Sequence, residues 1–431
     1  MNLKKRLSYS LITHLLYKFS FIISPIILFP TIINYLNVNI FEFWIITNSI
    51  LIFIFANDFG IGMSKLMELN KYLKININSF KIKINTILNF KIILYSIYLI
   101  IITLVIFHFD IQIIQPLFII AIVYQTINHL SIVLSHALWS SGKNWLIYLI
   151  NGFCQIFEII LFLLLLFIFK ADVYSFISFP LLSIIRAIIL LIVVTKINLF
   201  KYGIDFDIKF LFSKASGILG FIFETLASNT KLHLLRFLLG LVLSGFKFTQ
   251  ITILFTFANL SKNICASISQ IIFPELNQIR DDKEKFNAYS LEYIRLGFFF
   301  NLIICIIFII FGEKIINLWM SNNDFFEKDL FYLIIFIVFF QNINELISYI
   351  FQSINKHLVY YTIYIVFLTS SLVIFFVTKS LITLLYVYLT VEVIMIFINL
   401  YLLKKIIKLK NLIDIFALSK FFVTIRKYLD F

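Results

Sequence analysis

The sequence predicts an all-α integral membrane protein with about twelve transmembrane helices. Of its 431 residues, 61% are hydrophobic and only 13% are charged, whereas a soluble domain is about half apolar and about a quarter charged. Long, nearly continuous runs of Ile, Leu and Phe fill almost the whole chain. These runs favour helices over a membrane barrel, because barrel strands are short segments of alternating polarity.

Each predicted span is an apolar run of about 20 residues, the length that crosses a bilayer as a helix. We place the spans at residues 8–36, 43–66, 84–107, 116–139, 145–169, 176–195, 217–243, 246–273, 291–311, 330–351, 358–377 and 381–403.

The lysines and arginines predict the orientation of the chain in the membrane. With the N-terminus inside, the cytoplasmic segments hold 23 of them and the outside connections hold 5. Because cytoplasmic connections are enriched in Lys and Arg, we expect both termini to be cytoplasmic. Residues 404–431 form a basic cytoplasmic tail that suits contact with anionic membrane lipids.

A faint internal repeat suggests two halves. Ser140–Tyr148 joins the fourth and fifth spans, and Ser353–Tyr361 joins the tenth and eleventh with a similar short basic turn. Turns of one kind six spans apart favour two six-helix bundles of the same orientation, which we place at residues 1–200 and 201–403.

Ionisable residues inside spans are the candidate functional residues, because a charge at membrane depth needs a cavity or a partner. Lys18 lies about eleven residues into the first span, on the face that also carries His14. At 1.5 Å per residue it is about 16 Å deep, near the middle of the bilayer. By contrast, we expect Lys65, Lys91 and Arg295 to reach the cytoplasmic interface with their long side chains.

The seventh span has the highest density of polar residues. Asn229, His233 and Arg236 recur at helical spacing on one face, while Glu224 and Lys231 share roughly the opposite face. One face would line a cavity and the other would pair with a neighbouring helix. We therefore take Asn229, Lys231 and Arg236 as candidate substrate-binding residues, with an internal ion pair as the alternative.

Polar residues also follow one face of the eighth span and mark the end of the second. Asn259 and Lys262 open a stripe that continues through Asn263, Ala266, Ser269 and Gln270, and such a stripe needs water or protein opposite it. At the end of the second span stands Asp58. We take Asn259 and Lys262 as substrate-binding candidates, and Asp58 and Glu224 as candidates for binding a coupling ion.

The sequence gives no support for catalysis or for nucleic-acid binding. We find no nucleotide-binding loop of the G-x-x-x-x-G-K-[ST] type, no nucleophile elbow and no zinc-protease helix. We therefore expect neither an enzyme nor a cofactor or metal site. The excess of basic residues lies between apolar runs and forms no stretch long enough for a nucleic-acid groove.

Two stretches carry a resemblance to a known family. Residues 35–44 (YLNVNIFEFW) and residues 57–62 (NDFGIG) resemble the polysaccharide-export flippases of the multidrug/oligosaccharidyl-lipid/polysaccharide (MOP) superfamily, which include the O-antigen and capsule repeat-unit flippases. Weaker similarities lie at residues 273–276 and 311–320. Asn37 is a departure, since the family usually has Gly there.

The resemblance implies two six-helix bundles around a central cavity that alternates its access between the two sides of the membrane. The implied substrate is an oligosaccharide repeat unit linked to undecaprenyl pyrophosphate, moved from the cytoplasmic to the periplasmic leaflet of the bacterial inner membrane for surface polysaccharide assembly. A polymerase and chain-length machinery are the implied partners. Cations such as Lys18, Lys262 and Arg236 suit a pyrophosphate, which needs charge and hydrogen bonds in place of water.

Three alternatives remain open. A cation-coupled multidrug antiporter of the same superfamily should prefer acidic cavity residues, whereas the deep residues here lean basic. A membrane polysaccharide polymerase typically needs a large outside loop, and the longest here is residues 312–329. A purely structural membrane scaffold would not explain why charged residues lie deep within the predicted spans.

Overall fold

The computed structural model confirms an all-helical chain, and it describes residues 3–58, 60–109, 115–170, 172–204, 206–213, 215–243, 245–279, 282–320, 323–354 and 357–407. No strand occurs within these ranges. Over the same residues, ten helices are long and apolar enough to cross a membrane. The predicted basic tail from residue 408 onward lies outside the described residues.

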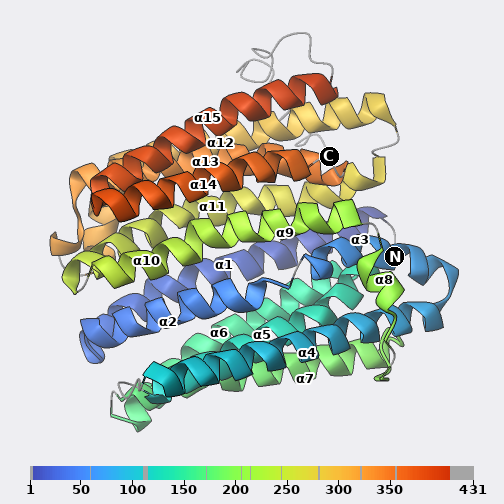
Figure 1. Cartoon of the computed structure of the whole chain (residues 1–431), viewed down its shortest axis with the longest axis horizontal. Coiled ribbons are helices and arrows are strands. Elements are labelled where there is room, and N and C mark those ends of the chain that lie inside the picture. Colours follow the sequence, from blue (N-terminus) through green and yellow to red (C-terminus); the bar gives the residue numbers. More distant parts are fainter. Residues whose placement is uncertain are drawn as a thin grey trace. The chain divides into compact units, whose positions relative to one another are not determined.

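The chain packs as two compact units, Met1–Thr249 and Gln250–Phe431. In Figure 1 the helices of each unit run nearly parallel or antiparallel to their neighbours. The first unit holds α1 (Leu3–Tyr35), α2 (Val38–Ala56), α3 (Ile61–Ile75), α4 (Ile77–Phe109), α5 (Gln115–Ser140), α6 (Asn144–Ile168), η1 (Val173–Ile177), α7 (Ser178–Lys196), α8 (Ile208–Phe212), α9 (Ala215–Asn229), η2 (Thr230–Leu234) and α10 (Leu235–Val242). We expected α9 and α10 to open the second bundle, and they pack here against α2 and α3.

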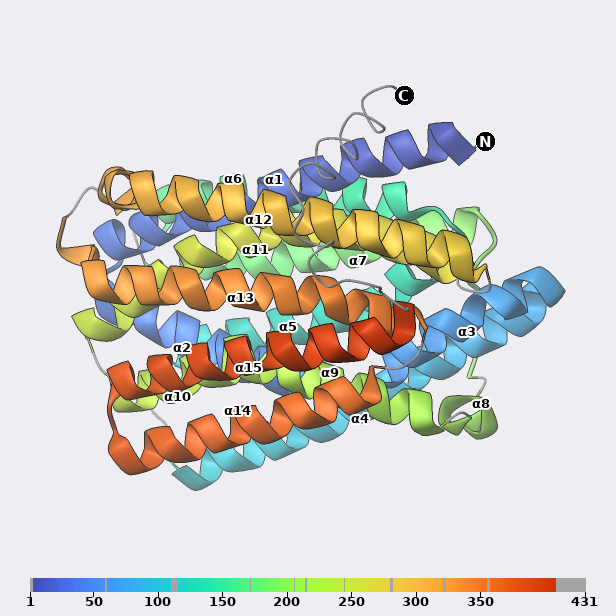
Figure 2. The same cartoon turned by 90° about the horizontal axis from the view of Figure 1, so that it is seen from above.

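The second unit is built around a central helix. It holds most of α11 (Phe246–Ile279), then α12 (Lys283–Met320), η3 (Asn323–Phe325), α13 (Lys328–Ser353), α14 (Leu358–Thr378) and α15 (Leu381–Ile407). Figure 2 shows α13 between α12 and α15, with α14 against the far side of α15. The apolar window of α13 is 67% buried, the highest share among the candidate spans. Helix α13 is therefore the core of this unit.

The prediction of one continuous span at residues 43–66 was wrong. Helix α2 ends at Ala56, and α3 starts at Ile61 after a turn in which Gly60 is left-handed with φ of 65°. A Cβ on Gly60 would lie 2.6 Å from the backbone N of Ile222 and 2.8 Å from the O of Ile218, both in α9. Two constraints therefore select glycine at this position: its positive φ and the close approach of α9.

The departure at Asn37 has a conformational explanation. Asn37 has φ of 105° and ψ of 167°, a region that glycine adopts almost alone. Its side-chain Oδ1 accepts a hydrogen bond from the backbone N of Ile40 at 3.0 Å and so caps α2. Asparagine therefore fills a glycine-like position and contributes a cap that glycine lacks.

The predicted span at residues 217–243 is helical but not continuous. A π-helical turn, η2, separates α9 from α10, and the backbone N–H of Leu235 donates to the carbonyl of Thr230 five residues earlier. Such wide turns are rare and occur frequently at functional sites. The extra residue shifts the register, so side chains before and after the turn do not follow the simple i, i+4, i+7 pattern that we assumed.

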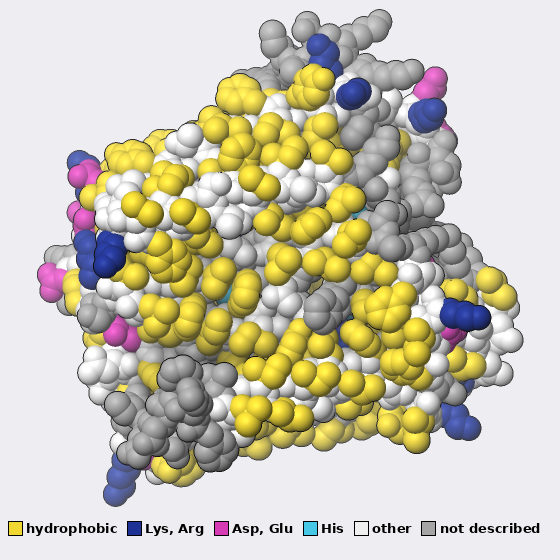
Figure 3. Space-filling view, in the orientation of Figure 1, with side chains coloured by type: hydrophobic (Ala, Val, Ile, Leu, Met, Phe, Trp, Pro, Cys, Tyr) yellow, Lys and Arg dark blue, Asp and Glu magenta, His cyan; other side chains and the backbone are white. Residues whose placement is uncertain are grey.

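The surface suits a lipid environment. In Figure 3 apolar side chains cover the middle of the visible face, and charged side chains gather toward the left and right edges, where helices end. Large apolar residues are exposed along the spans, for example Leu104, Phe167, Val377 and Phe397. Acyl chains satisfy such a surface, whereas water would not.

Candidate functional site

The turn between α2 and α3 carries a buried ion pair. Nζ of Lys91 on α4 lies 2.9 Å from Oδ2 of Asp58, and the two side chains are 4% and 12% exposed. The hydroxyl of Tyr98, also on α4, donates to the carbonyl of Asn57 at 2.7 Å. The expectation that Lys91 reaches the interface was wrong, because the carboxylate holds it inside the unit. Asp58, our candidate for ion coupling, is therefore paired with Lys91.

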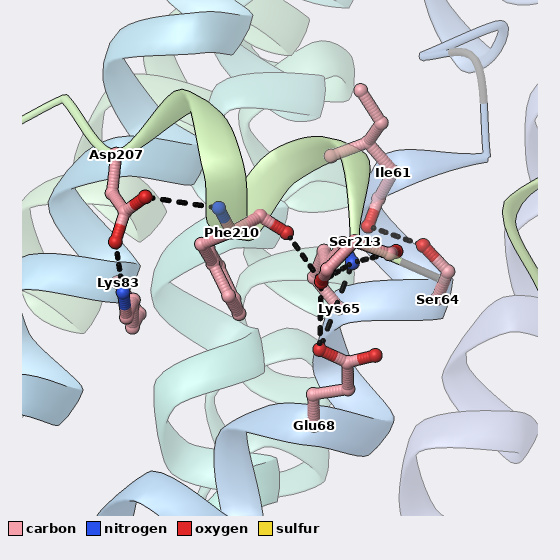
Figure 4. A network of polar contacts seen from close by, with 8 residues as sticks. All are labelled: Ile61, Ser64, Lys65, Glu68, Lys83, Asp207, Phe210 and Ser213. Atoms are coloured by element: carbon pink, nitrogen blue, oxygen red, sulfur yellow. Dashed lines mark hydrogen bonds and ion pairs between the residues drawn. The ribbon is translucent and has the colours of Figure 1, made fainter. Parts of the chain in front are cut away.

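Lys65 is also buried rather than at the interface. Its Nζ donates to the carbonyl and the hydroxyl of Ser213 at 2.6 and 2.7 Å, and it lies 3.6 Å from Oε2 of Glu68. Figure 4 shows this contact next to a second one, in which the carboxylate of Asp207 pairs with Lys83. Together these contacts fasten the segment around α8 to α3 and α4.

The environment of Asp207 favours its charged form. Its carboxylate accepts from the ammonium of Lys83 and from the backbone N of Phe210, at 2.9 Å in the second case. The hydrogen bond from Lys83, followed by the backbone hydrogen bond, holds the pKa of Asp207 below its usual value of 3.8. Asp207 therefore keeps its charge, and with it these contacts, at neutral pH.

Lys18 and His14 lie where α1 packs against α6. The ring of His14 is fully buried and meets the ring of Tyr148 edge-on, with centroids 4.4 Å apart. Nζ of Lys18 lies 5.9 Å from the ring centroid of Tyr17, which itself stacks on Tyr148. Lys18 is half-buried, so the structure places this cation at a cluster of aromatic rings inside the first unit.

Two sets of amide hydrogen bonds lie in the interior of the first unit. The amide of Gln155 on α6 donates to Oε1 of Glu158 at 3.1 Å and to the hydroxyl of Ser24 on α1 at 3.2 Å. On α7, the guanidinium of Arg186 donates to Oδ1 of Asn128 on α5. These contacts offset part of the cost of placing a carboxylate and a guanidinium inside an apolar bundle, although Nε of Arg186 has no hydrogen-bond partner among the described residues.

The candidates of the seventh span surround the π-helical turn. Glu224 and Asn229 belong to α9, Lys231 and His233 to η2, and Arg236 to α10. All five side chains are half-buried. The Nδ2 group of Asn229 is buried and has no hydrogen-bond acceptor within the described part of the chain. Three basic side chains, Lys231, His233 and Arg236, thus lie close together in the sequence where the π-helical turn widens the helix.

In the second unit, Lys262 is paired. Its Nζ on α11 lies 3.1 Å from Oε2 of Glu345 on α13, with side chains 18% and 29% exposed. Asn259, one turn earlier on α11, is half-buried. The side chains of Ala266, Ser269 and Gln270, which would continue the stripe, are outside the described residues.

A second polar group in this unit is fully buried. Asn344 on α13 donates to Oε2 of Glu392 on α15 at 2.8 Å, and the hydroxyl of Tyr364 on α14 donates to Oε1. Asn399 donates to Oδ1 of Asn344 at 2.7 Å. All four residues are 0% exposed. This network joins three helices around one carboxyl group.

Sequence reasoning found most of the ionisable residues and missed their partners. Asn128, Gln155, Asn344 and Tyr364 complete the networks, and their signal was available as amide and phenol groups inside apolar runs. What the sequence lacked was the pairing, because these contacts join residues on different helices. Over the described residues, no group of three or more His, Cys, Asp or Glu side chains could hold a metal ion.

Comparison with known proteins gives a likeness of fold. No protein-family model and no curated protein matches this chain. Among solved structures, a mutant of the Vibrio cholerae MATE transporter VcmN has 15% identity and a TM-score of 0.68, covering 96% of this chain and 98% of that one. VcmN in its bent form has 14% identity and a TM-score of 0.64, covering 94% and 98%.

A third solved structure extends the likeness. It is the outward-facing conformation of a multidrug resistance MATE family transporter of the MOP superfamily, with 15% identity and a TM-score of 0.64, covering 95% of this chain and 97% of that one. Identities this low establish the fold and no more. The chain therefore has the fold of MATE transporters along nearly its whole length.

Proposed function

We propose that this chain is a multi-pass membrane transporter that works by alternating access. The observation that carries the proposal is the MATE-like fold across 96% of the chain, combined with a buried ion pair in the first unit and a half-buried one in the second. Such groups are costly in a membrane and mark transport pathways more often than structural cores. A transporter also needs none of the catalytic motifs that the sequence lacks.

The first candidate activity is cation-coupled export of small amphipathic compounds. Of the three cations that suggested an anionic substrate, Lys262 lies against the carboxylate of Glu345. Lys91 likewise lies against the carboxylate of Asp58. Each pair brings together one positive and one negative charge, which weakens the argument for a pyrophosphate. A carboxylate that separates from its lysine can bind a proton, a sodium ion or a cationic substrate in its place. Such an exchange would couple the movement of the ion to that of the substrate. The MATE neighbours support this candidate better than the flippase.

The second candidate is a flippase for an oligosaccharide linked to undecaprenyl pyrophosphate. It is supported by the NDFGIG stretch, where Gly60 adopts a conformation that glycine favours, and by the formal net charge of +14. In this reading a polymerase and chain-length machinery of the bacterial inner membrane would be partners. Lys231 within the π-helical turn and Arg236 shortly after it are the cations that would bind the phosphates.

The residue roles are part of the proposal. Asp58 and Glu224 would bind a coupling ion. The substrate-binding groups of the flippase would be Lys18, Asn229, Lys231, Arg236, Asn259 and Lys262. The two activities differ in the sign of charge that these groups must recognise. Neutral variants therefore distinguish them, because the loss of a lysine should impair a flippase and should leave export of a cationic dye largely intact.

The test is transport in proteoliposomes with two substrates in parallel. One preparation contains a cationic dye with an imposed proton or sodium gradient, and the other contains a fluorescent lipid-linked oligosaccharide whose leaflet is read by quenching. Gradient-dependent dye efflux supports the first candidate, and translocation of the lipid supports the second. Activity in neither assay, with protein that is folded and inserted, would contradict both.

A further inference from the structure

The connection between α7 and α9 exposes an unusual amount of apolar surface. We call residues 197–213 the linker; Asp205 is outside its described part. Tyr202 is 62% exposed, Ile204 88%, Ile208 59% and Phe212 61%. A connection in water normally carries polar side chains at such positions, because exposed apolar groups gain nothing there. We therefore expect lipid or protein, and not water, to cover this surface.

The backbone of the linker faces the bundle. Side-chain amides one helical turn apart on α4 bind two of its carbonyls, Asn85 to the carbonyl of Lys201 at 2.9 Å and Asn89 to that of Gly203 at 3.1 Å. Backbone polar groups near a membrane need such partners. Because the carbonyls are held on the bundle side, Tyr202 and Ile204 are left on the outer side.

The same sidedness continues into α8. Phe210 and Leu211 are 3% and 0% exposed and join the apolar core of the first unit, while Ile208 and Phe212 remain outside. Figure 4 shows Asp207 at the start of α8 with its carboxylate turned to Lys83. Helix α8 is thus fixed to the bundle through one face and presents the other outward.

The linker directly follows a candidate membrane-spanning helix and carries exposed lysines. Helix α7 exposes Ile188 and Ile192 before it ends at Lys196, and the linker follows directly. Lys196, Lys201 and Lys209 are exposed. Apolar side chains interleaved with lysines at the end of a membrane span match the interface of a bilayer that contains anionic headgroups.

We propose that the linker binds the surface of an anionic bilayer, with Tyr202, Ile204, Ile208 and Phe212 inserted at the boundary of the acyl chains. Lys201 and Lys209 contact the phosphates of anionic phospholipids. The hydrophobic gain comes from the inserted side chains and the preference for anionic lipid from the lysines. The inference holds whatever the protein transports, since it concerns only the first unit and its bilayer.

Insertion is tested with a spin label on Ile204→Cys in liposomes of phosphatidylcholine and phosphatidylglycerol. The three native cysteines are buried, and unmodified protein treated with the label provides the blank. We expect collisions with oxygen, which concentrates in lipid, to exceed those with a water-soluble nickel chelate. The same label on Lys201→Cys should show the reverse. A label at residue 204 that collides mainly with the nickel chelate would overturn insertion. A label shielded from both reagents would also overturn it, because protein and not lipid would then cover this site.

The lipid preference is tested by thermal unfolding in detergent with added phosphatidylglycerol or phosphatidylcholine. The native protein should be stabilised at lower concentrations of phosphatidylglycerol. In a variant with both Lys201→Gln and Lys209→Gln, the concentration of phosphatidylglycerol needed for the same stabilisation should rise about 25-fold. Each lysine near an anionic surface contributes a factor of about five. Lys170→Gln, in the connection after α6, is the matched control and should behave like the native protein. An unchanged preference in the double variant, or equal responses to both lipids in the native protein, would overturn the role of the lysines.

Discussion

Removing one member of the Asp58–Lys91 pair should destabilise the protein strongly. Lys91→Met leaves the Asp58 carboxylate with 12% exposure and without the ammonium that lies 2.9 Å away. At an effective dielectric constant of about 20, two unit charges at this separation attract by about 6 kcal/mol. Part of that attraction offsets desolvation, and breaking a buried pair typically costs about 3–5 kcal/mol. We expect a loss in this range for Lys91→Met and for Asp58→Asn.

The assay is a double-mutant cycle read by reversible unfolding in mixed micelles of mild detergent and dodecyl sulfate. The double variant carries neither charge, so its loss of stability should be well below the sum of the single losses, by at least about 2 kcal/mol. The pair Lys285–Asp282 is the matched control, because its atoms are also 2.9 Å apart while its side chains are 68% and 44% exposed. Its variants should cause no measurable loss. Additive effects at Asp58 and Lys91 would refute the pair as a coupled, buried contact.

Four further outcomes follow from the structure. Gly60→Ala should lower the unfolding free energy by more than Gly245→Ala, since both have positive φ but only Gly60 meets backbone atoms within 3 Å, and chemical unfolding of the two variants compares them. Asn37→Gly should cost only a few tenths of a kcal/mol and Asn37→Ala about 1–2 kcal/mol, because alanine loses the cap and keeps the unfavourable φ. The pKa of Asp207 is lower in the folded state than its usual 3.8, so the stability it provides is present above pH 3.8 and is lost as the pH falls through the folded pKa; limited proteolysis of residues 197–213 should accelerate in acid, and Asp207→Asn should remove that dependence. Glu345→Gln should leave stability nearly unchanged, because the side chain is 29% exposed, and should reduce gradient-driven transport in proteoliposomes.

The positions of the helices were predictable from the sequence because the apolar runs are long. Every predicted span contains helix, and α14 at Leu358–Thr378 nearly coincides with the predicted 358–377. The break at residues 57–60 was not predicted, although Asn57, Asp58 and Gly60 are typical turn residues. Apolar residues on both sides made one long run, and the close approach of α9 that selects Gly60 comes from a distant part of the chain.

The ionisable residues within the apolar runs are visible in the sequence, whereas their pairing is not. Lys262 was singled out as a candidate, and its contact with Glu345 joins residues 83 positions apart on two helices. Lys91 was misjudged because an apolar run with a lysine near its end has the same pattern whether the lysine reaches water or a buried carboxylate. The π-helical turn after Asn229 likewise has no local signal, since its residues suit an ordinary helix.

Transport by purified protein tests the central claim most directly. Protein reconstituted in liposomes with an imposed proton or sodium gradient should move a cationic dye against its concentration, and Glu224→Gln should abolish this movement while retaining basal binding of the dye. Dye that stays in place under every gradient, together with lipid-linked oligosaccharide that stays in its leaflet, would contradict the assignment as a transporter.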